Sequence, residues 1–216
     1  MLAQTSIQNL QVKNLFPTPV VHGLLPDADV LNQQLLEIIL ARQAIEPSVA
    51  RSNRGGWQSA TDFAAWSGVP GERLLTIAQQ LGTQLTLQAT EAELRPLDNI
   101  WRVNSWVNIN VTNDYNAVHH HAGAFWSGVY YIDVGGVDTF SDYEGALEFH
   151  DPRGIAPLLY APELRMGIKG CLTAGNVELH RPKAGQIVIF PSWLLHAVQP
   201  YRGPSRRVSV AFNLCF

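Results

Sequence analysis

Three histidines of this sequence, His119, His121 and His196, have the residue type and spacing needed to hold a metal ion. His119 and His121 belong to a run of three consecutive histidines, and His196 follows 75 residues after His121. Side chains two residues apart on an extended strand share a face, so His119 and His121 point together and His120 points away. A neighbouring strand that carries His196 would complete a three-point cap and leave the other metal positions open for substrate and oxygen. The pattern predicts a metal enzyme.

The other histidines have less support as ligands. His22, His150 and His180 are isolated in the sequence, and an isolated histidine is more often a surface or core side chain. His120 has the wrong parity on a regular strand, but a β-bulge would exchange its role with that of a neighbour. The three histidines named first are therefore the predicted ligands, with His120 as the alternative.

The C-terminal segment 206–215 alternates between a polar and an apolar face. Arg207 and Ser209 fall on the polar face, and Arg207 lies 11 residues after His196, which leaves room for a turn between the two strands. An arginine fork and a hydroxyl two residues apart, directed into a barrel, can together hold a carboxylate. The segment therefore predicts that Arg207 and Ser209 bind a dicarboxylate cosubstrate.

The elements that must position these groups divide the chain into a helical front and a stranded back. Apolar residues at helical spacing predict helices at 31–42 and 71–87. The turn-rich stretch 52–59 between them could form a surface loop or supply substrate contacts, and by itself it favours the surface loop. Residues 154–182, which contain several Pro and Gly, are expected to form a long connection over the site. Strands are expected at 105–111, 118–121, 127–132, 147–150, 186–191 and 206–215.

Length and composition indicate one compact domain. The chain has 216 residues, 46% of them hydrophobic, which is enough to bury a sizeable core. Short strands separated by Gly, Asp, Asn and Pro clusters favour a sandwich or jelly roll. We expect a mainly β fold with flanking helices, a double-stranded β-helix (jelly roll, cupin-like barrel) with an N-terminal helical segment. The domain would span 1–216, with a helical supporting segment at 1–100 and the jelly-roll core at 101–216.

Charge and cysteine content bound the partners and the compartment. The net charge is −3 and the 15 Lys and Arg residues are scattered, so no basic face is expected for nucleic acid or an anionic membrane. No run approaches the roughly 18 consecutive apolar residues that a membrane helix needs. Cys171 and Cys215 are too few for a disulfide framework, and no signal core is apparent. We expect a cytoplasmic protein without nucleic-acid or membrane partners, with a homodimer left open.

Taken together, these residues resemble the iron(II)- and 2-oxoglutarate-dependent oxygenases. That family carries a His-x-Asp or His-x-Glu pair, then a distal His, then an Arg-x-Ser or related basic motif. His119-x-His121, His196 and Arg207-Val208-Ser209 follow this order, although an imidazole stands where a carboxylate is usual and leaves the metal its full positive charge. The closest likeness is to a bacterial and phage branch, and it rests on residues 15–19, 52–59, 127–131, 190–196 and 207–213.

The resemblance implies Fe(II) and 2-oxoglutarate as cofactors and O2 as co-reactant. It also implies that Asn110 and Tyr131 point toward the cosubstrate, as in prolyl-hydroxylase-like relatives. For Tyr131 the alternative is a buried aromatic residue with a hydrogen-bonded hydroxyl. An enzyme of this family hydroxylates a substrate C–H bond and releases succinate and CO2; its substrate here would be a small molecule or a peptide.

Two other interpretations stay open. The first is a cupin-type three-histidine metal enzyme, either a 2-oxoglutarate-independent dioxygenase or an isomerase, because segment 185–196 is similar to the second cupin motif. Trp193 and Pro200, however, replace its usual Gly and Asn, and Phe125 stands where the first cupin motif has Glu. The second is a noncatalytic binding module on the same barrel, which is favoured only if the purified protein takes up neither metal nor cosubstrate.

Overall fold

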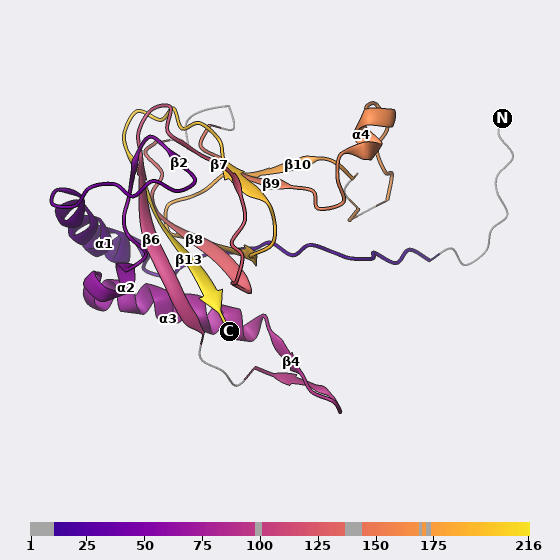
Figure 1. Cartoon of the computed structure of the whole chain (residues 1–216), viewed down its shortest axis with the longest axis horizontal. Helices are drawn as coiled ribbons and strands as arrows, with labels where there is room; N and C mark the ends of the chain where they lie inside the picture. The colour runs from indigo at the N-terminus through magenta and orange to yellow at the C-terminus, as the bar shows by residue number, and fades with distance from the viewer. Residues whose placement is uncertain (1–10, 98–100, 137–143, 169, 172–173) are drawn as a thin grey trace, which may run out of the picture.

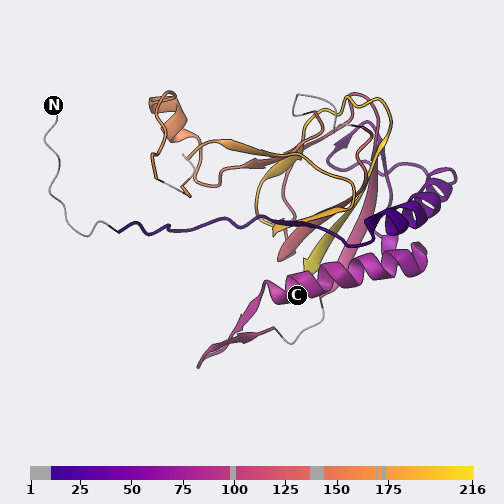
Figure 2. The same ribbon diagram turned by 180° about the vertical axis from the view of Figure 1, so that it is seen from behind.

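Two antiparallel sheets face each other in the computed structural model, which describes residues 11–97, 101–136, 144–168, 170–171 and 174–216 (Figures 1 and 2). In pairing order, the six-stranded sheet consists of β1 (Val21–Leu24), β11 (Gln186–Pro191), β8 (Trp126–Asp133), β13 (Arg207–Cys215), β6 (Arg102–Asn110) and β3 (Trp57–Gln58). The five-stranded sheet consists of β10 (Val177–His180), β9 (Leu147–His150), β12 (His196–Val198), β7 (Tyr115–His119) and β2 (Asn53–Arg54). A separate hairpin joins β4 (Leu87–Ala89) and β5 (Leu94–Pro96). From β6 to β13 the chain passes back and forth between the two large sheets, which is the expected double-stranded β-helix.

Most of the expected strands are present, with one difference that affects the site. The strands at 147–150 and 186–191 have the expected bounds, and β6, β8 and β13 differ from expectation by a few residues. In contrast, β7 ends at His119, so His120 and His121 lie beyond it in the turn that leads to β8. The sequence pattern does not predict β1 to β5 or β10, because strands of two to four residues are too short to show alternation and depend on their partner strands.

Two long helices cover the outer face of the six-stranded sheet (Figure 1). The helix expected at 31–42 lies within α1 (Ala28–Gln43), and the second expected helix is α3 (Gly68–Gln84), which ends before 87 because β4 begins there. The short α2 (Phe63–Trp66) precedes α3. In the part of the chain that the structure describes, no helix is long and apolar enough to cross a membrane.

The apolar face of β13 anchors the helices to the sheet. Val208, Val210 and Phe212, which the sequence places on that face, are fully buried. They belong to one cluster with Leu35 of α1 and Leu74 of α3. Because burying one such side chain contributes roughly 1.5–3 kcal/mol, this cluster fixes the strand and directs its polar face toward the second sheet.

Residues 154–182 do not form the connection over the site that the sequence predicts. They contain α4 (Ala156–Tyr160) and β10, and β10 pairs with β9 at the edge of the five-stranded sheet. The segment carrying α4 projects away from the barrel, and residues 11–20 run outward on the same side (Figure 2). The expectation is wrong because β9 and β10 form the edge of the five-stranded sheet, and the segment that joins them therefore lies beyond that edge.

Candidate metal centre

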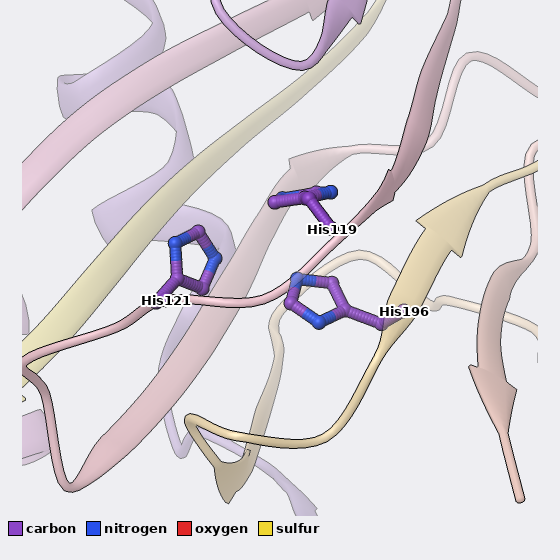
Figure 3. Close-up of side chains that lie close together, drawn as sticks. All are labelled: His119, His121 and His196. Carbon is purple, nitrogen blue, oxygen red and sulfur yellow. The ribbon is translucent and has the colours of Figure 1, made fainter.

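His119, His121 and His196 come together where β7 and β12 pair (Figure 3). His119 is the last residue of β7 and lies opposite His196, the first residue of β12. His121 lies two residues past β7, where its backbone N–H donates to the carbonyl of Ser192 at 3.0 Å. The ring centroids of His119 and His196 are 4.3 Å apart, and that of His121 lies 4.9 Å from the first and 5.1 Å from the second. The pairing of β7 with β12 in the five-stranded sheet, together with the turn after β7, therefore brings the three predicted side chains to one point.

Backbone carbonyls set the orientation of two of these rings. Nδ1 of His119 lies 2.7 Å from the carbonyl oxygen of Ala117, and Nδ1 of His196 lies 2.8 Å from that of Leu194. A carbonyl only accepts, so each Nδ1 carries the proton and each Nε2 keeps a free lone pair. Such a partner behind the ring is usual for metal-binding histidines. The two rings are therefore in the tautomer that a metal requires.

The spacing of the three rings is compatible with one metal ion. One ligand atom from each histidine lies within 4.8 Å of the others, whereas two nitrogens bonded to one metal are roughly 3 Å apart. Among the described residues, none gives the ring of His121 a hydrogen bond like those that hold the other two rings. Rotation of that ring can therefore close the remaining distance.

The other histidines are engaged elsewhere. His120 is exposed and lies outside the cluster. His22 and His180 lie against each other with ring centroids 5.0 Å apart, and Nε2 of His150 is 2.7 Å from a carboxylate oxygen of Glu148. His120 thus lies apart from His119 and His121, although the strand ends before it.

Burial and mutual repulsion keep the three clustered histidines neutral. Burial lowers the pKa of His121 to about 4 and that of His196 to about 3, and the neighbouring imidazoles add to both effects. Burial also lowers the pKa of His119, against the opposing effect of its bond to the Ala117 carbonyl. Metals bind the deprotonated ring, so no proton has to leave at neutral pH. Loss of metal binding is therefore expected well below the ordinary imidazole value of ~6.5.

We expect the metal-free protein to lose stability as the pH falls from about 7 to about 5. The pKa values of His121 and His196 in the folded state lie below the unfolded value of ~6.5. Between the folded-state and unfolded-state pKa values the unfolded chain binds protons that the folded chain does not. The free energy of unfolding therefore decreases as the pH decreases. At about 1.4 kcal/mol per pKa unit, each of these two histidines should lower the stability by on the order of 2 kcal/mol over this range.

Urea unfolding of the metal-free protein at a series of pH values measures this loss. His196→Gln is the matched variant, because it keeps a neutral polar side chain of similar size and removes the titrating group. Its unfolding free energy should fall less steeply with pH than that of the wild type. Parallel curves for the two proteins would show that His196 is not held neutral by burial.

A cavity of about 50 Å³ lies between the histidines and a buried arginine. Arg207, on the inner face of β13, is 2% exposed and donates from Nη1 to the carbonyl of Gly145. Within the described part of the chain, its Nε has no partner and no carboxylate forms an ion pair with it. Burial lowers the pKa of this guanidinium. Since an unpaired buried charge is costly, the cavity is suited to an anionic ligand.

Ser209 and Tyr131 line the same cavity and lie directly opposite each other on β13 and β8. Burial raises the pKa of Tyr131 to about 12, although the charge of Arg207 acts in the other direction. The phenol therefore stays protonated and can donate a hydrogen bond. The guanidinium carbon of Arg207 lies 5.7 Å from the centroid of the Tyr131 ring. Guanidinium and two hydroxyl groups thus share one cavity.

Asn110 is placed differently from the other predicted cosubstrate residues. It is buried and lies opposite Arg207 in the β6–β13 pairing, but it is not among the residues that line the cavity. The side chain of Asn110 lies close to Gly56 instead: a Cβ added to Gly56 would be 3.4 Å from Nδ2 of Asn110. Asn108, two residues earlier on the same face and opposite Ser209, lines the cavity instead.

Sequence reasoning misses several other residues that line the cavity. Trp106 shares the parity of Asn108, and its ring centroid lies 5.5 Å from that of His121; alternation along β6 could have identified both. Ser52 and Asn116 also line the cavity, and Nδ2 of Asn116 donates to Oγ of Ser52 at 3.2 Å. Their position results from the pairing of β2 with β7, for which the sequence gives no local signal.

Comparisons with solved structures agree with this architecture. A prolyl-4-hydroxylase from Pseudomonas putida is 18% identical, with a TM-score of 0.55 and 92% of each chain covered. A prolyl hydroxylase from Trichoplax adhaerens, solved with a peptide fragment of the hypoxia inducible factor oxygen degradation domain, is 11% identical, with a TM-score of 0.58 and 91% of this chain and 82% of that chain covered. HygX from Streptomyces hygroscopicus, solved with nickel and 2-oxoglutarate, is 11% identical, with a TM-score of 0.53 and coverage of 92% and 83%. At these identities the likeness shows the fold.

The sequence itself matches one family. A family model described as "Putative 2OG-Fe(II) oxygenase" matches residues 104–213, which is more than half of the chain. No curated protein matches the sequence. The matched region contains the whole histidine cluster and Arg207, and the chain therefore belongs to the 2OG-Fe(II) oxygenase family, whose cofactors are Fe(II) and 2-oxoglutarate.

Proposed function

We propose that this protein is a hydroxylase in which His119, His121 and His196 hold Fe(II), and Arg207, Ser209 and Tyr131 hold 2-oxoglutarate. One observation carries the proposal: a buried arginine, to which the described residues offer no carboxylate partner, shares a small cavity with three neutral, clustered imidazoles. The arginine end of the cavity matches one carboxylate of a dicarboxylate. The histidine end matches a metal ion that the other carboxylate can reach. Family membership supports the oxygenase class.

The three histidines fit a divalent metal in chemistry as well as in position. His119 and His196 present Nε2 because their Nδ1 protons are held by carbonyl groups, and His121 is held in place through its backbone. All three are neutral at physiological pH, which spares the cost of removing protons. Neutral ligands leave the bound metal its full positive charge, which favours a negatively charged cosubstrate beside it.

At the other end of the cavity, Arg207 supplies the fork that matches a carboxylate. Ser209 and Tyr131 supply hydroxyl groups from the adjacent strand positions. Asn110 does not line the cavity, so we assign it to the support of Arg207 through β6 rather than to direct contact with the cosubstrate. The enclosure of this end keeps water away from the ion pair and strengthens it.

Fe(II), together with 2-oxoglutarate and O2, supplies the oxidising chemistry that hydroxylates a C–H bond and yields succinate and CO2. The protein contributes orientation of the two carboxylates and exclusion of water. The assignment as a hydroxylase is supported by the names of the P. putida and T. adhaerens neighbours, and the peptide bound to the latter supports a peptide among the candidate substrates. A small molecule is the other candidate class.

A cupin-type three-histidine enzyme that acts without 2-oxoglutarate is the second candidate. The all-histidine ligand set favours it, because the family pattern has a carboxylate at the position of His121. The two functions differ in their need for Arg207: only the 2-oxoglutarate-dependent reaction uses a buried cation opposite the metal.

An assay of succinate release distinguishes the 2-oxoglutarate-dependent hydroxylase from the cupin-type enzyme. Purified protein with Fe(II), ascorbate and 2-oxoglutarate should release succinate under air, and the rate should rise with an accepted substrate. Omission of Fe(II) should abolish the release. Oxygen uptake that needs the metal but leaves 2-oxoglutarate unconsumed would contradict the proposal and favour the cupin-type function.

We further propose that residues 1–216 act as one domain in the cytoplasm. The helices of the first hundred residues share a hydrophobic cluster with the six-stranded sheet, which supports a single folding unit. Cys171 and Cys215 are both free thiols, which suits a reducing compartment.

A further inference from the structure

Two segments project from the barrel on the same side, and neither belongs to the metal centre. They are the N-terminal arm (residues 11–20) and the excursion between β9 and β10 (the described residues of 151–176), which carries α4 (Figures 1 and 2). The carboxylate of Asp151 accepts from the backbone N–H of Gly175 at 2.8 Å and binds the Arg153 guanidinium through both oxygens. Asp151 therefore ties the end of the excursion to its start and fixes its base.

The arm and the excursion carry a concentration of exposed apolar side chains. Among the described residues, 24 large hydrophobic side chains are exposed, and nine of them lie on these two segments, which hold fewer than one in five of the described residues. Phe16 on the arm is 88% exposed, and Tyr160 at the end of α4 is 89% exposed. Exposed apolar side chains that gather on one part of a domain indicate an interaction site.

A cavity of about 610 Å³ lies between the arm and the base of the excursion. Its floor includes the buried side chains of Phe149 and Leu194, and its walls include Phe16 and Ile168. The arm and the excursion meet at one side of this cavity, where Sγ of Cys171 donates to Oδ1 of Asn14 at 2.9 Å. The same side of the molecule thus carries both a hollow with an apolar floor and, at the end of α4, apolar side chains that nothing in the described structure covers.

The charges of this face nearly cancel, which indicates what it can meet. A nucleic acid or an anionic lipid surface needs an excess of basic residues, and the face lacks one. A second copy of the same face could approach without net repulsion. Of the described residues concerned, Lys13, Arg153 and Arg165 carry positive charge, and Asp151, Glu163 and Glu178 carry negative charge.

We propose that the arm and excursion join two copies of this chain in a two-fold symmetric dimer, in which Leu159 and Tyr160 of one copy enter the 610 Å³ cavity of the other. A two-fold axis brings the same patch of both subunits together, so the patch must be complementary to itself. A projecting apolar tip and a hollow with an apolar floor on the same side of the molecule meet that condition. The two segments supply more than thirty described residues, against roughly 20–30 per partner in a standard stable interface.

The dimer contact reaches the wall behind the metal centre. The carbonyl of Leu194 on the cavity floor holds the Nδ1 proton of His196. Phe149 on the same floor packs against Phe190 with ring centroids 5.0 Å apart, and Phe190 packs against His196 at 4.7 Å. A side chain from the second copy would therefore press on the residues that orient one of the clustered imidazoles.

Sedimentation equilibrium of the full-length protein tests the interface. The wild type should have twice the monomer mass of 23.9 kDa, and the double variant Leu159→Ser/Tyr160→Ser should associate roughly thirtyfold or more weakly. Ile45→Ser and Val69→Ser remove side chains that are 76% and 78% exposed on the helical side and should leave the dimer intact. A monomeric wild type, or a dimer that the double variant does not weaken, would overturn the proposal.

Thiol cross-linking tests the placement of the tip in the cavity. In a Cys215→Ser background, Tyr160→Cys should be joined to the partner's Cys171 by a short bismaleimide, giving a covalent dimer. Adding Cys171→Ser should remove that product, while circular dichroism confirms that the variant is folded. No covalent dimer, or one that persists after Cys171→Ser, would show that α4 does not enter the partner's cavity.

Discussion

Replacing His196 by Ala is expected to abolish stoichiometric Fe(II) uptake. His196 is buried, its Nδ1 proton is held by a backbone carbonyl, and its Nε2 faces the other two imidazoles. Loss of a supporting partner alone commonly costs 10–100-fold in metal affinity, so loss of the ligand itself should cost on the order of 100-fold or more. Anaerobic calorimetry with Fe(II), or metal analysis after gel filtration, measures the change.

His120→Ala is the matched control for this loss. His120 precedes His121 directly, yet it is exposed and lies outside the cluster. The variant should bind Fe(II) as the wild type does, whereas His119→Ala and His121→Ala should both bind far more weakly. Loss of uptake in His120→Ala with retention in His121→Ala would show that the turn after β7 presents a different imidazole to the metal.

The second large effect concerns 2-oxoglutarate. Arg207→Lys keeps the positive charge but replaces a planar fork by a single ammonium group. The fork is buried and its Nε is unpartnered among the described residues, so the geometry of the contact should matter. A hydrogen bond to a charged group contributes roughly 1.5–3 kcal/mol, and affinity for 2-oxoglutarate should therefore fall tenfold or more, with Fe(II) binding unchanged.

Arg206→Lys provides the comparison within the same segment. Arg206 immediately precedes β13 and is exposed, where a charge usually contributes little. Calorimetric titration of 2-oxoglutarate into both metal-loaded variants should show wild-type affinity for Arg206→Lys alone. Equal affinities for Arg207→Lys and the wild type would falsify the assignment of Arg207 as the carboxylate-binding residue.

Alternation within single strands is the part of this fold that can be predicted from the sequence. It places Val208, Val210 and Phe212 in the core and Arg207 and Ser209 in the cavity, because one buried face of a sheet forces a period of two. The same rule groups His119 with His121, but the physical reason differs, since β7 ends at His119 and a backbone hydrogen bond to Ser192 holds His121.

Features that depend on pairing between distant segments escape prediction. Ser52 reaches the cavity only because β2 pairs with β7, and two residues are too few to carry a pattern. Residues 154–182 were expected over the site because Pro and Gly break any regular element, but β10 pairs with β9 and takes the segment away from it. Asn110 has the predicted parity, yet Asn108 lines the cavity. Parity determines which face of the strand a side chain lies on, but not which residue along that face reaches the cavity.

The shared use of one cavity by metal and cosubstrate is tested most directly by an anaerobic absorption titration. When 2-oxoglutarate is added to the Fe(II)-loaded protein, we expect a visible metal-to-ligand charge-transfer band that saturates at one equivalent per chain. The band should be absent without Fe(II) and in His196→Ala, and it should need more 2-oxoglutarate in Arg207→Lys. A metal-loaded protein that develops no band, or that binds 2-oxoglutarate equally well with and without metal, would contradict the joint site.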